Sequence, residues 1–198
     1  MEKRAGNRAR ELMFAAIYLP DFALQAAVRH APALHRQPVA LLENDEARAT
    51  IFQLTPSATE AGVRAGMTSS QALARCLRLT IKGRAPAQEK IAGDILLDHA
   101  ATLAPEIEAT APGVCTVHFS SGKNCRAHVE RVVRQLAHLH LSAQVGLATT
   151  PDLSFLAACL ARPILQVDDT RNFLAPLPIE TLLQLLPVDK ICLRSAVP

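Results

Sequence analysis

Hydrophobic positions along the chain follow two different periods, and each period predicts a different kind of element. Residues 13–19 form a short, continuous apolar run that ends before a proline, which is typical of a buried strand. Strands are predicted at 107–111 and 114–119, because these segments flank Pro112-Gly113, a pair typical of the turn in an antiparallel hairpin. Further strands are predicted at 38–43, 49–54, 77–81, 143–148 and 164–167, the first two of them as an antiparallel pair.

Apolar residues spaced three or four apart predict helices in the remaining segments. The clearest is at 125–139, where valines and leucines line one face and charged side chains face outward. In the segment 86–103 the apolar face includes Ile91, Leu96 and Ala100, which predicts a long amphipathic helix. Shorter helices are predicted at 22–30, 56–61, 70–76, 153–161 and 179–186.

Polar residues and glycines mark the ends of these helices. Asp21 is expected to cap the helix at 22–30 and to contribute about 1 kcal/mol of stability; its alternative role is a remnant metal ligand. Thr68 or Ser69 is expected to cap the helix at 70–76, and Gly62 can adopt the left-handed conformation after the helix at 56–61. The element order therefore predicts an α+β fold: a mixed or antiparallel sheet covered by helices, interrupted early by a smaller unit between about residues 23 and 83.

Composition limits the classes of function. The chain has 198 residues, of which 49% are hydrophobic, so it can bury a sizeable core as one domain or two small ones. Aromatic residues make up only 4%, which argues against a protein that stacks single-stranded bases. The formal net charge of +3 and a sequence pI near 8.7 permit contact with DNA without requiring it.

Neither a metal site nor a disulfide framework is expected. The five cysteines are widely spaced and contain no CxxC pair, and the seven histidines lack metal-binding spacing. We therefore predict no cofactor and a reducing, cytoplasmic environment.

The N-terminus resembles a secretory signal, because basic residues precede the apolar run at 13–19. However, Pro20-Asp21 stands where a signal would have its cleavage site. No apolar stretch reaches the roughly 20 residues that a membrane span requires.

A basic stretch supplies the candidate nucleic-acid contacts. Lysine and arginine side chains in such a stretch can bind DNA phosphates, although they can equally be solvated surface charges. The candidate residues are Arg75, Arg78, Lys82 and Arg84.

Several segments resemble the Y-family DNA polymerases. Gly62-Val-Arg-Ala-Gly-Met67, followed by Gln71-Ala-Leu-Ala-Arg-Cys76 and Leu79, is similar to the family's fingers signature, and residues 146–163 are similar to its late palm segment. Residues 173–178 resemble the beginning of the thumb. The sequences of residues 18–25 and 108–115 are similar to those of ImuB-type proteins in particular. The resemblance covers about residues 12–187. It implies a Y-family polymerase-like palm at 10–22 and 84–166, a small inserted fingers-like subdomain at 23–83 and a truncated thumb-like start at 167–198.

The resemblance also locates where catalytic residues would stand. Nucleotide transfer by two metal ions needs carboxylates that hold two Mg²⁺ about 4 Å apart. The family's Asp-x-Asp falls on Leu19 and Asp21, and its Asp-Glu pair falls on Pro112 and Gly113. The residues that would bind the triphosphate are replaced by Pro56, Thr59 and Pro151. Glu106 and Glu108 are poor substitutes, because Glu108 lies roughly 13 Å from Pro112 along an extended strand. No catalytic residue and no metal site are therefore expected.

These departures predict a non-catalytic Y-family-like protein. The resemblance implies an adaptor in DNA-damage-induced mutagenesis and translesion synthesis, as in the SOS response. Its partners would be an error-prone replicative-type DNA polymerase, a RecA-like accessory protein and a sliding clamp, with weak or indirect contact with DNA. The alternatives are an active low-fidelity DNA polymerase with a rearranged metal site, a DNA-binding module that acts through Arg75 and Arg78, and a truncated product without function.

Overall fold

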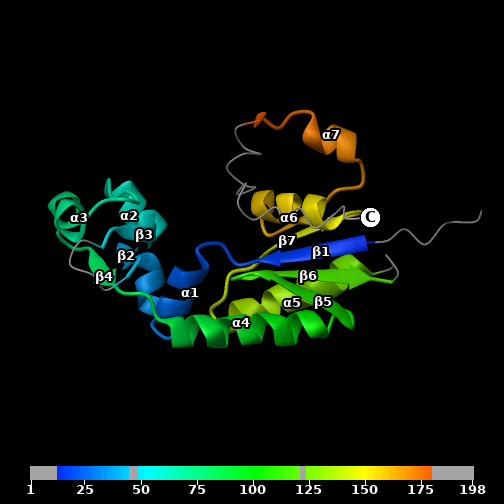
Figure 1. Cartoon of the computed structure of the whole chain (residues 1–198), viewed down its shortest axis with the longest axis horizontal. Coiled ribbons are helices and arrows are strands. Elements are labelled where there is room, and N and C mark those ends of the chain that lie inside the picture. The colour runs from blue at the N-terminus through cyan, green and yellow to red at the C-terminus, as the bar shows by residue number, and fades with distance from the viewer. Residues whose placement is uncertain (1–12, 45–48, 121–123, 180–198) are drawn as a thin grey trace, which may run out of the picture.

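The computed structural model describes residues 13–44, 49–120 and 124–179, which form two sheets with their helices (Figure 1). The larger sheet has the strand order β5-β6-β1-β7-β8. Its strands are β1 (Met13–Tyr18), β5 (Glu106–Ala111), β6 (Val114–Phe119), β7 (Gln144–Ala148) and β8 (Ile164–Gln166). β1 is the central strand and runs antiparallel to both β6 and β7, while β8 is parallel to β7. The predicted mixed sheet and the hairpin at Pro112-Gly113 are confirmed.

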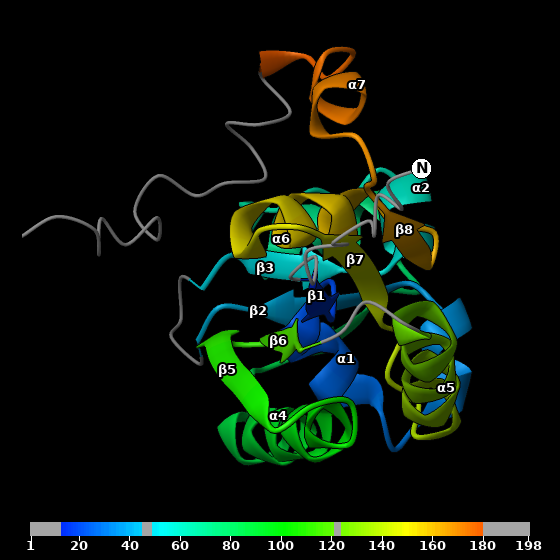
Figure 2. The ribbon, with the colours of Figure 1, turned by 90° about the vertical axis from the view of Figure 1, so that its right-hand side faces the viewer.

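Helices cover both faces of the larger sheet (Figure 2). α4 (Pro86–Ala101) and α5 (Cys125–His138) lie on one face, and α6 (Pro151–Leu160) packs on β1 and β7 from the other. Because side chains alternate along a strand, Ala15 and Ile17 of β1 enter the core with α4 and α5. Tyr18 faces the opposite way and makes an edge-on ring contact with Phe155 of α6.

Periodicity fixes the buried face of α5 but not that of α4. Val129, Val132 and Leu136 are buried, as their spacing in α5 predicts. In α4, Ile91 is 47% exposed, so its predicted place on the buried face is wrong. The core contacts come instead from Ala92, Leu96 and Ala100. Apolar residues surround most of α4, so only its packing against neighbouring elements selects the buried face.

The smaller unit is a three-stranded sheet with the order β3-β2-β4. β2 (Val39–Leu42) and β3 (Ile51–Leu54) pair antiparallel as predicted, and β4 (Thr80–Lys82) adds in parallel to β2. Two helices pack on it, α2 (Pro56–Glu60) and α3 (Ser69–Arg75). Thr68 caps α3 in a reciprocal capping box with Gln71. β4 begins three residues later than predicted, because residues 77 and 78 form a turn after α3.

One helix, α1 (Phe22–Val28), belongs to both units. Phe22 and Ala26 lie in the core of the larger sheet, whereas Leu24 and Val28 pack with β2 in a separate apolar cluster. The backbone N–H of Leu24 also donates to the side chain of Gln53 in β3 (2.8 Å). The link between the two units is therefore a shared helix with one face in each core.

Two short helices were not predicted from the sequence. They are the 3₁₀ helix η1 (Pro32–Arg36) and α7 (Thr170–Leu174), whose N-cap Asp169 accepts hydrogen bonds from two backbone N–H groups. The helix predicted at 179–186 lies, apart from Ile179, outside the described residues. No helix within the described ranges is long and apolar enough to cross a membrane.

Gly146 tests how closely α6 packs on the sheet. A Cβ at this position in β7 would overlap the carbonyl oxygen of Ser154 and the amide nitrogen of Ala158 in α6. We expect Gly146→Ala to reduce the free energy of unfolding by about 3 kcal/mol in urea titrations, since backbone atoms cannot move aside easily. Gly93→Ala in α4 is the control: its Cβ would meet only Phe22 at 3.9 Å, and alanine should stabilise the helix by about 0.5 kcal/mol. Equal effects of the two substitutions would contradict this packing.

Candidate functional site

The positions at which the resemblance places carboxylates converge at one end of the larger sheet. Leu19 directly follows β1, and Pro112 and Gly113 form the turn between β5 and β6. The backbone N–H of Leu19 donates to the carbonyl oxygen of Gly113 (2.8 Å). The fold thus brings together residues that are more than ninety positions apart in the sequence.

The residues at these positions take part in apolar packing. Leu19 is completely buried and belongs to the core beneath α4 and α5. Gly113 has a positive φ of 74°, and a Cβ on it would lie 2.7 Å from Cβ and Cγ of Phe22. Any side chain at position 113 would therefore be strained in its backbone and would collide with the Phe22 ring. Sequence reasoning missed Phe22, because nothing local to α1 shows that its ring covers the hairpin turn.

Asp21 does not cap α1 with its side chain, so the predicted N-cap is wrong. Its backbone is left-handed (φ 48°, ψ 45°) and its carboxylate accepts no hydrogen bond from the helix. A capping side chain needs an extended backbone at this position, which the turn after Pro20 does not provide. Burial raises the pKa of the Asp21 carboxyl above its ordinary value. The carboxylate therefore receives no stabilising partner from the N-terminus of α1.

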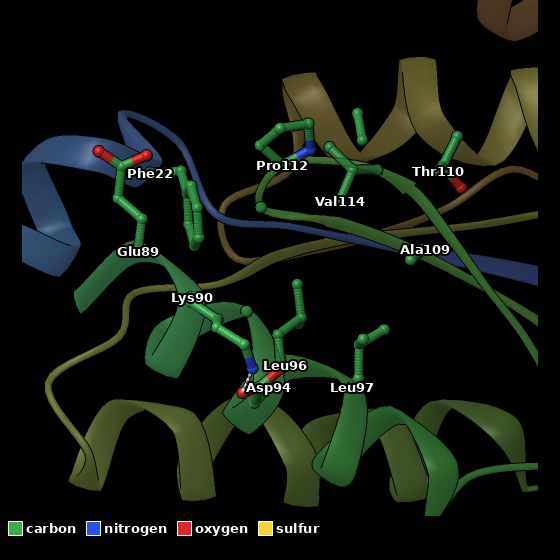
Figure 3. A pocket seen from close by; sticks show the side chains of 13 residues that line it. Phe22, Glu89, Lys90, Asp94, Leu96, Leu97, Ala109, Thr110, Pro112 and Val114 are labelled. Atoms are coloured by element: carbon green, nitrogen blue, oxygen red, sulfur yellow. Dashed lines mark hydrogen bonds and ion pairs between the residues drawn. The ribbon is translucent and has the colours of Figure 1, made fainter. Parts of the chain in front are cut away.

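A cavity of about 570 Å³ lies between the hairpin turn and α4 (Figure 3). Its walls are largely apolar and include Phe22, Leu96 and Val114. Two acidic side chains line it, Glu89 and Asp94, and both are already paired. The Nζ of Lys90 lies 2.7 Å from Asp94, as the dashed line in Figure 3 marks, and this hydrogen bond raises the pKa of Lys90.

Glu89 forms a two-pronged ion pair with Arg84. The guanidinium Nε donates to Oε1 (2.9 Å) and the terminal nitrogen donates to Oε2 (2.5 Å). The hydrogen bond with Glu89 raises the pKa of Arg84, whose guanidinium also lies 5.7 Å from the ring centre of Phe52 in β3. Arg84 thus joins the smaller unit to the start of α4, a role that its place in a basic run did not reveal.

Glu106 and Glu108 lie on the strand face that points away from α4, and they do not converge on Asp21. Glu106 is paired with Nδ1 of His118 (2.5 Å), whose ring stacks on Phe14 with centroids 4.8 Å apart. Across the described ranges of the chain, no group of three acidic, histidine or cysteine side chains could hold a metal ion. The arrangement offers apolar packing and paired charges, and among the described residues it offers no ligand set for two magnesium ions.

The remaining candidate basic residues lie in the smaller unit. Arg75 ends α3 and Arg78 is in the turn that follows; both side chains are exposed, and neither forms an ion pair with another described residue. Lys82 is half-buried in β4. The structure therefore places Arg75 and Arg78 together and separates them in role from Arg84.

Comparisons with known proteins agree on the fold. A protein-family model described as the impB/mucB/samB family matches residues 17–159. Among solved structures, DinB from Sulfolobus solfataricus matches with a TM-score of 0.75 and 14% identity, over 85% of this chain and 52% of that one. An insertion ternary complex of Dbh DNA polymerase matches with a TM-score of 0.74 and 15% identity, over 85% and 53%. The chain thus spans about half the length of these proteins. Because the sequence identity is only 14–15%, the similarity shows a shared fold. No curated protein sequence matches the chain.

The contact between Phe22 and Gly113 can be tested by a double-mutant cycle. We expect Gly113→Ala to reduce the free energy of unfolding by about 2 kcal/mol, from backbone strain and from the collision with the ring. In a Phe22→Ala background the same substitution should cost about 1 kcal/mol less, because alanine lacks the Cγ and Cδ2 atoms that the added Cβ would meet. Additive losses in urea unfolding would show that the ring does not limit position 113.

The substitution Asp21→Asn tests whether the ionised Asp21 carboxylate destabilises the folded protein. Because the pKa of this group is raised in the folded protein, ionisation opposes folding, and stability should fall as the pH rises through the ordinary value of 3.8. At pH 7 the variant should be more stable by about 0.3 kcal/mol, a small figure because solvent screens the group. Below pH 3 the two proteins should unfold alike. A wild-type protein that gains stability from added Mg²⁺ while the variant does not would instead identify Asp21 as a metal ligand.

Proposed function

Since the chain belongs to the impB/mucB/samB family and has the fold of Y-family DNA polymerases, we propose that it is a non-catalytic, polymerase-like adaptor in translesion synthesis and DNA-damage-induced mutagenesis. The observation that carries the proposal is the packing of Phe22 over Gly113. This contact occupies the space at the hairpin turn where the resemblance expects a metal-binding carboxylate.

The chemistry of two-metal catalysis supports this proposal. The reaction needs several carboxylates around one point, to bridge the attacking and the leaving oxygens through the two ions. Leu19 is an aliphatic residue in the core, and Asp21 is the single acid at the catalytic positions that the resemblance defines. The cavity carboxylates Glu89 and Asp94 already neutralise Arg84 and Lys90. Recruiting Glu89 would leave the Arg84 guanidinium without its carboxylate partner, whereas the exposed pair of Lys90 and Asp94 would be separated at little cost.

The positions expected to bind a triphosphate have local structural roles. Pro56 and Pro151 are the first residues of α2 and α6, where a proline suits the helix start. The hydroxyl of Thr59 donates to the carbonyl oxygen of Thr55 in the preceding turn. None of these three side chains carries the positive charge that β- and γ-phosphates attract.

The adaptor would act through protein partners. By the resemblance these are an error-prone replicative-type DNA polymerase, a RecA-like accessory protein and a sliding clamp, with DNA bound weakly or indirectly. A simple DNA-binding module is a second candidate function, favoured by the exposed guanidinium groups of Arg75 and Arg78, neither of which forms an ion pair with another described residue.

Primer extension tests the proposal. Purified protein is incubated with a primed DNA template, deoxynucleotides and either Mg²⁺ or Mn²⁺, beside an active Y-family polymerase as the positive control. We expect no incorporation above background, because the described residues supply no metal-binding carboxylate pair. Incorporation that is lost in Asp21→Asn would overturn the non-catalytic proposal. This substitution is preferred to alanine because asparagine tolerates the left-handed backbone at position 21.

Partner binding forms the second arm of the test. Immobilised protein is presented separately with the polymerase, the RecA-like protein and the clamp, and the adaptor proposal expects at least one to bind. If none of the three binds but DNA does, with an affinity that falls steeply with salt and with loss of Arg75 and Arg78, the DNA-binding module replaces the adaptor.

A further inference from the structure

The tip of the smaller unit exposes two leucines beside two arginines. Leu73 lies in the last turn of α3 and is 38% exposed, and Leu77 is 90% exposed. Arg75 and Arg78 are exposed in the same short segment. We call these four residues the α3 patch. Figure 1 shows α3 at the end of the molecule that is farthest from the larger sheet, so the patch is open to a partner.

The backbone fixes the outward direction of Leu77 and Arg78. The N–H of Cys76 donates to the carbonyl of Ala72 and ends the helix, and the N–H of Leu79 donates to the carbonyl of Cys76 (3.1 Å). This second bond closes a four-residue turn with Leu77 and Arg78 at its two central positions. Such positions usually hold glycine, proline, asparagine or aspartate. A leucine exposed there gains nothing from the fold itself.

The charge of the two patch arginines has no acidic partner among the described residues. Between residues 49 and 84 the sequence has five cations, namely Arg64, Arg75, Arg78, Lys82 and Arg84, and one acid, Glu60. Arg84 is neutralised by Glu89, and Arg64 donates to the backbone carbonyls of Thr59 and Val63. Arg75 and Arg78 have no acidic partner among the described residues. The patch is therefore both positively charged and apolar.

This combination selects one class of partner. DNA phosphates would satisfy the two arginines but would leave the leucines in water, and the patch has no aromatic side chain on which a base could stack. A protein surface can bury the leucines and pair with the arginines at the same time. We propose that the α3 patch docks a short segment of a partner protein in which apolar side chains are flanked by carboxylates.

This proposal rests on the proposed adaptor function and identifies the surface through which the adaptor would bind a partner protein. Complementary charge would steer the acidic segment to the arginines, and burial of Leu73 and Leu77 would hold it there. Four side chains make a small surface, so the expected contact is a short, transient one of the kind that a linear peptide segment makes.

Fluorescence anisotropy with designed probes tests the docking site on the full chain. The first probe is a labelled peptide of about 16 residues with leucines along one helical face and glutamates elsewhere. The second is an isomer of the same composition whose leucines are scattered around the helix. Single-stranded and duplex DNA of about 16 nucleotides are the third and fourth.

Three sets of substitutions identify the residues responsible. Leu73→Ser with Leu77→Ser removes the apolar groups, and Arg75→Gln with Arg78→Gln removes the charges. The matched control is Leu139→Ser with Arg131→Gln and Arg134→Gln, which changes an exposed leucine and two exposed arginines at α5. Because the altered side chains lie at the surface, we expect all variants to fold with the wild-type circular dichroism; Leu73 and Leu139 are only 38% and 37% exposed, so their substitution should lower the unfolding midpoint slightly and to a similar degree.

We expect the amphipathic peptide to bind the wild-type protein at least about tenfold more tightly than its isomer. Each patch variant should weaken that binding about tenfold or more, and the control should stay within about twofold. The proposal is overturned if the peptide does not bind, if it binds without dependence on the leucines, or if DNA binds and only the arginine variant weakens it. These outcomes are independent of primer extension, so failure of the docking site and failure of the non-catalytic proposal are distinguishable.

Discussion

The structure depends on the position of one aromatic ring. Phe22 begins α1, lies against Gly113 in the hairpin turn, and reaches with the tip of its ring to Gly93 of α4. The hydrogen bond from Leu19 to Gly113 holds the same turn against the end of β1. Four elements thus meet at one buried ring, and Gly113 is the position at which the absence of a side chain makes room for it. Apolar packing thus surrounds the positions at which the resemblance places the carboxylates, beside the cavity that Phe22 and the hairpin turn line.

The chain passes between the larger and the smaller unit twice, and a different kind of contact connects the units at each passage. At the first crossing α1 contributes side chains to both cores, so apolar burial links the units. At the second, Arg84 bridges Glu89 at the start of α4 and Phe52 in β3 through an ion pair and a cation–π contact. The apolar link buries side chains of α1 in both cores, while the polar link holds the connection between β4 and α4 against both units.

Much of the fold follows from local pattern, and the exceptions share one cause. Strand β1, the hairpin, helix α5 and the Thr68 cap follow from periodicity and turn chemistry that a few neighbouring residues determine. The buried face of α4, the left-handed backbone of Asp21 and the ring of Phe22 depend on elements distant in the sequence. The convergence of Leu19, Pro112 and Gly113 was inferred by resemblance, but the reason that no side chain fits at 113 required the structure. Likewise, the sequence grouped Arg84 with Arg75 and Arg78, although tertiary contacts give it a separate role.

The central position of β1 has a consequence for the order in which the chain folds. Phe14 pairs with His118 on one side and with Ala148 on the other, so β1 cannot complete its hydrogen bonding until segments roughly a hundred residues later are present. The smaller sheet closes over short sequence separations and can form first. Until β6 and β7 arrive, an apolar strand with two open edges is exposed to other chains. During synthesis this strand is therefore a segment that a chaperone could usefully cover.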